Sequence, residues 1–196
     1  MTDIVQGLAF GSVTLYGSVI AGPLTLLGAI AFASVVVWMM LTNLLGGLRD
    51  LHSDMRFGVR TTPIQFGARP HGQGQAIPRW VTLYTYALQG VMIGLILSAL
   101  LYNEFGYGPA LRGMLAIALT ALSVGALLLL RKFFRLAHNY SKMIATGHLQ
   151  MAASSGALIL LFAPYMDSKL LLTLGIVFLA ALLQYNPNPP LPLNSA

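Results

Sequence analysis

The sequence lacks cysteine altogether, and charged residues make up only 8% of its 196 residues. The absence of cysteine excludes disulfide cross-links, thiol catalysis and zinc sites with cysteine ligands. Soluble domains of this size carry roughly 25% charged residues, so sixteen charged side chains are too few to cover a soluble monomer. Long uncharged stretches also exclude a disordered chain and a nucleic-acid-binding module, despite the net charge of +6.

What the sequence has in excess is apolar residues, at 57% of the chain and a mean hydropathy of +0.75. Runs of about 20 apolar residues cross a ~30 Å hydrocarbon core as helices, because an open strand leaves its backbone groups unpaired in lipid. The sequence predicts an all-α, polytopic transmembrane bundle in one domain (1–186), followed by a proline-rich tail (187–196). Six spans are expected, at about 4–21, 24–45, 81–102, 111–130, 151–165 and 170–184, the fifth beginning inside the polar stretch before it.

Basic residues predict which way the spans face. Nine of the eleven lie in two alternate connections, between spans two and three and between spans four and five. By the positive-inside rule, both connections face the cytoplasm, and so do both chain ends. We therefore expect an integral protein of the plasma (inner) membrane with a cytoplasmic motif loop at 46–80.

Two of the five acids, Asp50 and Asp54, lie four residues apart in that loop. If the second helix continues into the loop, their side chains lie on one face, one turn apart. Their repulsion needs an offset, either a divalent cation or neighbouring arginines. Mg²⁺ prefers a few carboxylates together with phosphate oxygens and water, and the forked donors of Arg49, Arg56 and Arg60 suit phosphate. The pattern suggests a lipid diphosphate substrate; the alternative is a solvated helix end with local Asp–Arg pairs.

The stretch from Arg49 to Gly67, RDLHSDMRFGVRTTPIQFG, resembles the second aspartate-rich motif of the UbiA superfamily of intramembrane prenyltransferases. That motif runs approximately Asp-x-x-x-Asp-x-x-x-Gly-x-Arg/Lys-Thr-x-Pro-x-x-x-Gly. The resemblance covers the C-terminal half to two-thirds of a nine-helix fold. It implies transfer of an isoprenoid chain from a polyprenyl diphosphate to a lipophilic or aromatic acceptor. It further implies that Asp50 and Asp54 hold Mg²⁺ as catalytic ligands while Arg49, Arg56 and Arg60 bind the diphosphate.

Two features depart from the family pattern. No first motif (Asn-Asp-x-x-Asp-x-x-x-Asp) is present, because Asp3 is the only acid before Asp50, and Gly46 and Gly47 stand where the family often has Asn-Asp. Half of the metal ligands are absent, so the chain alone is not expected to ionise a diphosphate. We expect the missing half to come from further N-terminal helices or from a partner chain.

Other functions stay open beside this one. A non-catalytic membrane scaffold derived from the UbiA fold would use the Asp/Arg cluster for structure. A small transporter or channel has less support, since such proteins usually place charges within their spans. No two of the four histidines lie three or four residues apart, which argues against a histidine metal site. Tyr84, Tyr86 and Gln89 are candidates either for a carbocation-stabilising cavity or for the membrane interface, and residues 131–135 are expected to anchor at the membrane surface.

Overall fold

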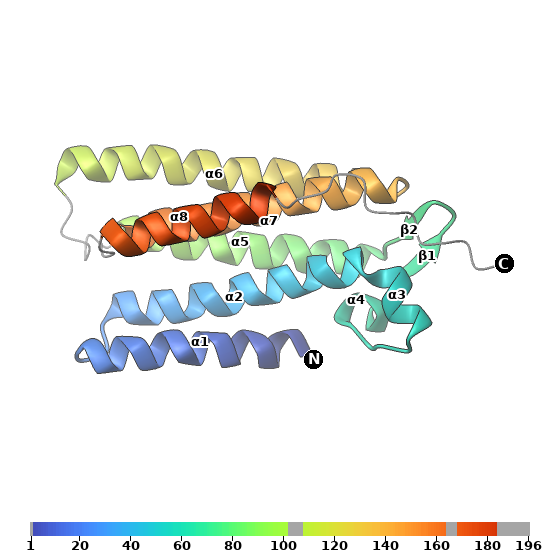
Figure 1. Ribbon diagram of the computed structural model, residues 1–196, viewed down its shortest axis with the longest axis horizontal. Helices are drawn as coiled ribbons and strands as arrows, with labels where there is room; N and C mark the ends of the chain where they lie inside the picture. Colours follow the sequence, from blue (N-terminus) through green and yellow to red (C-terminus); the bar gives the residue numbers. More distant parts are fainter. Residues whose placement is uncertain (1, 102–107, 164–167, 184–196) are drawn as a thin grey trace.

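The computed structural model describes residues 2–101, 108–163 and 168–183. Long helices lie side by side, and shorter elements gather at one end (Figure 1). The long helices are α1 (Thr2–Ala21), α2 (Leu26–Arg49), α5 (Arg79–Leu101), α6 (Pro109–Arg135), α7 (Tyr140–Phe162) and α8 (Ser168–Leu183). The elements between α2 and α5 are α3 (Leu51–Arg56), α4 (Thr62–Gln65), β1 (Arg69–His71) and β2 (Gly74–Ala76).

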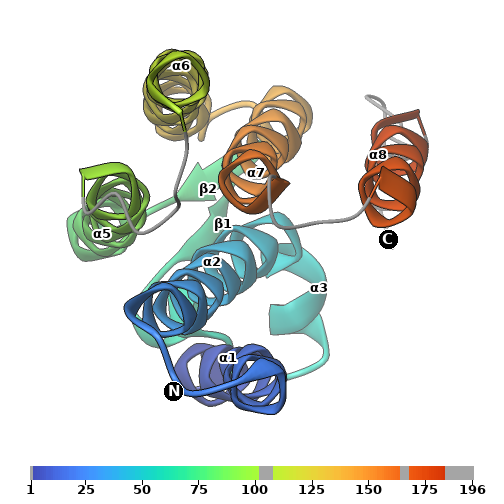
Figure 2. The same cartoon turned by 90° about the vertical axis from the view of Figure 1, so that its left-hand side faces the viewer.

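Within these described ranges, five helices are long and apolar enough to cross a membrane: α1, α2, α5, α6 and α7. Over the residues that the structure describes, the fold is all-α as expected apart from one short hairpin, and the five apolar helices make the chain an integral membrane protein. The sixth expected span corresponds to α8, whose 16 residues extend about 24 Å, less than the ~30 Å hydrocarbon core. In the end view, α8 stands apart from the other helices (Figure 2). The tail at 187–196 lies outside the described residues.

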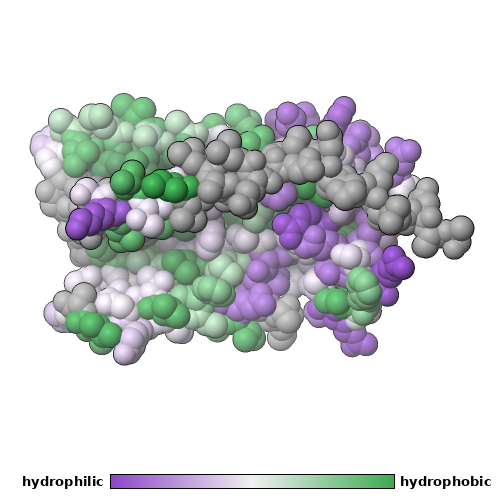
Figure 3. Space-filling view, viewed as in Figure 1, coloured by the Kyte–Doolittle hydropathy of each residue, from purple (hydrophilic) through white to green (hydrophobic). Residues whose placement is uncertain are grey.

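Large apolar side chains are exposed on the outer faces of the bundle. Val13, Met114 and Ile117 are 71%, 70% and 75% exposed. Figure 3 shows apolar residues over the helices and polar residues gathered towards the end that carries α3, α4 and the hairpin. Contiguous exposed apolar surface of this kind marks a face that another apolar phase covers, which is what lipid does around a membrane bundle.

Small residues set the contact between α1 and α2. A Cβ atom at Gly7 would lie 2.9 Å from the Val36 carbonyl oxygen, and one at Gly11 would lie 2.5 Å from Val36 Cγ2. These glycines therefore allow the close approach that the small-xxx-small spacing predicts. Any larger side chain there would push the two helices apart.

The polar end of the bundle has its own apolar core. Leu48 of α2, Leu51 of α3, Phe133 of α6 and Met143 of α7 belong to one cluster and are at most 1% exposed. Because Leu51 is buried among residues of the long helices, the short helix α3 is fixed against the bundle. The apolar residue that follows the motif's first aspartate thus anchors the motif.

The two basic connections meet at the same end of the molecule (Figure 1). The backbone N–H of Gln75, in the first connection, donates to the carbonyl of Ala137, in the second, at 2.7 Å. This common end is what the positive-inside pattern requires, and its cytoplasmic side stays a prediction. The helix α7 begins at Tyr140, inside the polar stretch as expected, because the Asn139 side chain caps it by accepting from the Lys142 N–H at 3.1 Å.

The hairpin of β1 and β2 was not among the expected elements. Its strands pair antiparallel, with Pro70 opposite Gln75 and His71 opposite Gly74. Gly72 occupies the turn with a φ of +55°, a conformation that glycine adopts without steric cost. The hairpin lies between the end of α2 and the α6–α7 connection, and it determines how the motif is held.

Candidate functional site

The predicted motif lies where α2 ends and α3 begins. The second helix continues past residue 45, which was the condition for Asp50 and Asp54 to share a face. It stops at Arg49, and Asp50 (φ −93°, ψ 10°) joins the two helices. The Asp50 N–H still donates to the Gly46 carbonyl at 2.8 Å, and the Asp54 N–H to the Asp50 carbonyl at 2.9 Å. Asp50 and Asp54 therefore remain one helical turn apart, although the helix is interrupted at the first of them.

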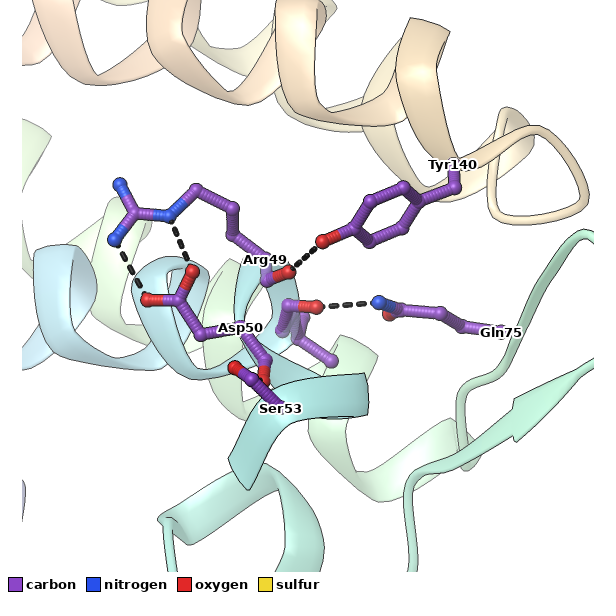
Figure 4. A network of polar contacts seen from close by, with 6 residues as sticks. Arg49, Asp50, Ser53, Gln75 and Tyr140 are labelled. Atoms are coloured by element: carbon purple, nitrogen blue, oxygen red, sulfur yellow. Dashed lines mark hydrogen bonds and ion pairs between the residues drawn. The ribbon is translucent and has the colours of Figure 1, made fainter. Parts of the chain in front are cut away.

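Asp50 is paired with its neighbour Arg49. The Nε and Nη2 atoms of Arg49 donate to Oδ1 and Oδ2 of Asp50 at 2.8 Å and 2.7 Å, as Figure 4 shows. The two side chains are 42% and 44% exposed, so solvent screens much of their attraction. Asp50, which was predicted to bind the metal, and Arg49, which was predicted to bind the diphosphate, thus bind each other.

Asp54 stands one turn further along, partly buried. Partial burial raises the pKa of Asp54 above its ordinary value, and the nearby Asp50 carboxylate adds to the rise while Arg49 opposes it. The two carboxylates therefore repel each other, and Arg49 only partly compensates. A cation between them would relieve that repulsion.

Arg56 and Arg60 are exposed. Arg56 ends α3, and Gly58 then turns the chain with a φ of +67°. Within the described part of the chain, neither arginine forms an ion pair with Asp50 or Asp54. The structure therefore brings together three of the five predicted site residues and leaves these two guanidinium groups accessible at the same end.

Sequence reasoning missed two residues that bind the end of α2, Gln75 and Tyr140. The Gln75 Nε2 group donates to the Leu48 carbonyl, and the Tyr140 hydroxyl donates to the Arg49 carbonyl (Figure 4). Gln75 lies 27 residues after Leu48, and Tyr140 lies 91 residues after Arg49. No local pattern reports contacts at such separations, so only the folded chain reveals them.

The two carboxylates suit a cation whose remaining ligands come from outside the protein. No three His, Cys, Asp or Glu side chains gather into a metal site anywhere in the described ranges. Two carboxylates one turn apart are nevertheless what Mg²⁺ takes from a protein when phosphate oxygens and water supply its other ligands. Asp50 and Asp54 therefore fit Mg²⁺ as a half-site, on condition that Arg49 releases Asp50.

The other candidate residues have structural partners. Gln89 is 1% exposed and accepts from Gln150 Nε2 at 2.7 Å, so it lines no open cavity. The Tyr84 ring contacts Phe66 edge-on, with centroids 5.8 Å apart. In the expected surface anchor at 131–135, the middle residue Phe133 is instead 1% exposed and belongs to the core, because Gly147 leaves room for its ring.

No protein-family model, curated protein or solved structure matches this chain. The resemblance to the UbiA superfamily therefore rests on the motif residues themselves.

Proposed function

We propose that this chain is the C-terminal part of a UbiA-type intramembrane prenyltransferase. The observation that carries the proposal is the pair Asp50 and Asp54, one turn apart at the polar end of an apolar helical bundle. Its substrates would be a polyprenyl diphosphate and a lipophilic or aromatic acceptor, both dissolved in the membrane lipid. Five long apolar helices and the seven motif positions from Asp50 to Gly67 support it.

Each site residue has a role that follows from its chemistry. Asp50 and Asp54 would hold Mg²⁺, which when bound neutralises charge on the diphosphate. The exposed guanidinium groups of Arg56 and Arg60 would donate forked hydrogen bonds to phosphate oxygens. Arg49 would do the same after leaving Asp50, and the apolar bundle would keep water from the allylic end of the substrate.

Catalysis by this arrangement needs more stabilisation than one half-site provides. Departure of a diphosphate develops negative charge that a pair of carboxylates with one cation and a few arginines does not fully offset. We therefore propose that the active unit contains further aspartates, contributed by additional helices or by a partner chain. The chain alone is then expected to bind a diphosphate and to transfer none.

Calorimetry on the purified chain in detergent tests the binding step. A non-hydrolysable isoprenoid diphosphate should bind at least about tenfold more tightly with Mg²⁺ than without it, because metal and phosphate complete each other's ligand sets. The variant with both Asp50→Asn and Asp54→Asn should lose this coupling. Arg60→Gln should weaken diphosphate binding, whereas Arg131→Gln, a basic residue of the other connection, should leave it unchanged. Wild-type protein without coupling would reject the proposal.

Reconstitution tests the chemical step. Co-expression with an N-terminal segment that carries the first motif should give Mg²⁺-dependent prenyl transfer. In that system Asp54→Ala should lower the rate at least about 10²-fold, as expected for loss of a preorganised charge-stabilising group. Equal turnover by the Asp54→Ala variant would contradict the assignment.

One observation favours a second candidate, a non-catalytic scaffold subunit. The bidentate bond from Arg49 satisfies Asp50 without any metal, as a purely structural role would require. In a scaffold, replacing Asp50 or Asp54 would change the stability of the fold and no ligand affinity. The calorimetric coupling therefore separates the two candidates.

A further inference from the structure

The last two carbonyl groups of α2 are bound by side chains from distant parts of the chain. A helix leaves its final carbonyls without donors. Here Gln75 of β2 donates to the carbonyl of Leu48, and Tyr140 of α7 donates to that of Arg49. Both bonds point at the helix end where Asp50 changes the direction of the chain (Figure 4).

The two donors are themselves fixed to each other. The Tyr140 N–H donates to the Gln73 carbonyl at 3.3 Å, and the Gln75 N–H donates to the Ala137 carbonyl at 2.7 Å. Gly74, between them, has no room for a side chain, because a Cβ atom there would lie 2.2 Å from the Ala137 carbonyl oxygen. Gln75 is only 6% exposed. Two backbone hydrogen bonds and a close approach at Gly74 thus join the hairpin to the α6–α7 connection beside the end of α2.

Tyr140 also contacts the helix that carries the second aspartate. Its ring meets the ring of His52 in α3 edge-on, with centroids 5.3 Å apart and planes inclined at 70°. The hydroxyl group therefore fixes the end of α2 while the ring supports α3. One side chain touches both segments that place Asp50 and Asp54.

We propose that Gln75 and Tyr140 are positioning residues of the aspartate site. They orient the α2–α3 junction, and through it the two carboxylates, without touching the ligand. What the carboxylates bind rests on the proposed function; the orientation itself does not. The placement matters because a shift of about 1 Å at a binding group can change rates about 10²-fold.

Two variants test the proposal on the full chain in detergent. Tyr140→Phe removes the hydroxyl and keeps the ring against His52, and Gln75→Leu removes the amide at similar size. Hydrogen exchange should accelerate about five- to tenfold at the α3-region amides of Asp54, Phe57 and Val59, the magnitude that loss of one buried hydrogen bond produces. Affinity for the Mg²⁺–isoprenoid diphosphate analogue should fall by a similar factor.

Trp38→Phe is the matched control. It removes a hydrogen bond of 3.0 Å, from Trp38 Nε1 to Ser155 Oγ, that joins the same two helices, α2 and α7, inside the bundle. It should lower the thermal unfolding midpoint while leaving α3 exchange and ligand affinity at their wild-type values. A general loss of stability would instead affect all three variants alike.

The outcomes separate this inference from the proposed function. Unchanged α3 exchange in both Tyr140→Phe and Gln75→Leu would overturn the inference. If the wild type binds the ligand and the two variants exchange faster yet bind it with full affinity, the inference is overturned too, since the orientation of the junction would then not matter for the ligand. A third outcome is faster α3 exchange in these two variants only, together with no Mg²⁺ coupling in the wild type. It would uphold the orientation of the junction by Gln75 and Tyr140 and reject the prenyltransferase assignment.

Discussion

Inside the bundle, Gln150 of α7 donates to Gln89 of α5 at 2.7 Å and to Ser154 at 3.1 Å, and all three side chains are at most 2% exposed. At the polar end, Gln75 and Tyr140 donate instead to backbone carbonyls. In this interior cluster, the Gln150 amide donates to other side chains and joins α5 to α7. At the polar end, Gln75 and Tyr140 bind the main chain, while Arg49 and Asp50 pair with each other and stay about half exposed.

This difference teaches where to look for function in a chain with few charges. A buried polar cluster whose members bind each other stabilises helix packing. A cluster that fixes the main chain while leaving carboxylates and guanidinium groups half exposed is what the proposed diphosphate site requires. The comparison predicts that interior variants change stability alone and that polar-end variants also change binding.

The largest expected effect is that of Gly74→Ala. The new Cβ would meet the carbonyl oxygen of Ala137 at 2.2 Å, and because the backbone fixes the positions of both atoms, no rotamer change relieves the contact. We expect a loss of about 1–3 kcal/mol in unfolding free energy, together with loss of diphosphate affinity. Gly90→Ala, at an α5 position with no atom within 4 Å, should cost nothing in either measurement. A Gly74→Ala protein as stable as wild type would show that hairpin and loop are not held in contact.

Next in size is Gln150→Leu. It removes the donor at 2.7 Å from Gln89 and leaves a buried amide short of a partner, which costs about 1–2 kcal/mol. Unfolding in detergent should show this loss, and Mg²⁺–diphosphate affinity should be unchanged. Adding Gln89→Leu should recover part of the stability, because both polar partners are then gone. Weaker ligand binding by Gln150→Leu alone would contradict the prediction that interior variants change only stability.

Arg49→Gln is expected to have a smaller effect, which raises the affinity for one ligand and lowers the affinity for the other. Removing the guanidinium group frees the Asp50 carboxylate, so the affinity for Mg²⁺ alone should rise by up to about fivefold, the value of an exposed ion pair. Affinity for the metal-free diphosphate should fall, because a donor to phosphate is lost. Calorimetry with each ligand separately measures both. Changes of the same sign would mean that Arg49 does not alternate between carboxylate and phosphate.

The smallest effect is a pH dependence from Asp54. Its pKa is raised in the folded protein, so between its ordinary value near 3.8 and the raised value the folded state holds more protons than the unfolded state. Stability should therefore fall slightly as the pH rises through this window and stay level above it. Asp54→Asn should remove the slope, and Mg²⁺ should reduce it by stabilising the ionised form. If the stability of the wild type, but not of Asp54→Asn, instead rises with pH in this window, the pKa of Asp54 is lowered in the folded protein and not raised.

Much of the bundle followed from the sequence because lipid imposes length and composition on each span. The starts of α5 and α6 lie within two residues of the expected spans. The early start of α7 has a local cause in its Asn139 cap. The helix α8 begins at Ser168, two residues before the sixth expected span.

The candidate site was only half predictable. Asp50, Asp54 and the neighbouring arginines stand out because charged residues are so rare in this chain. The turn glycine Gly72 was a usable signal for the hairpin, although strands of three residues each give almost no alternation to detect. Gln75 and Tyr140 carry no sequence signal, because their roles depend on contacts that arise only when the chain has folded.

The long separation between Arg49 and Tyr140 also bears on biosynthesis. The end of α2 leaves the ribosome 91 residues before the tyrosine that holds its carbonyl, a delay on the order of 5–20 s at ~5–20 residues per second. During that interval the aspartate segment has no partner from α7, so the proposed site is completed only after α5 and α6 have been inserted. Chains truncated before residue 140 should therefore reach the membrane with their first two spans in place and the site unformed.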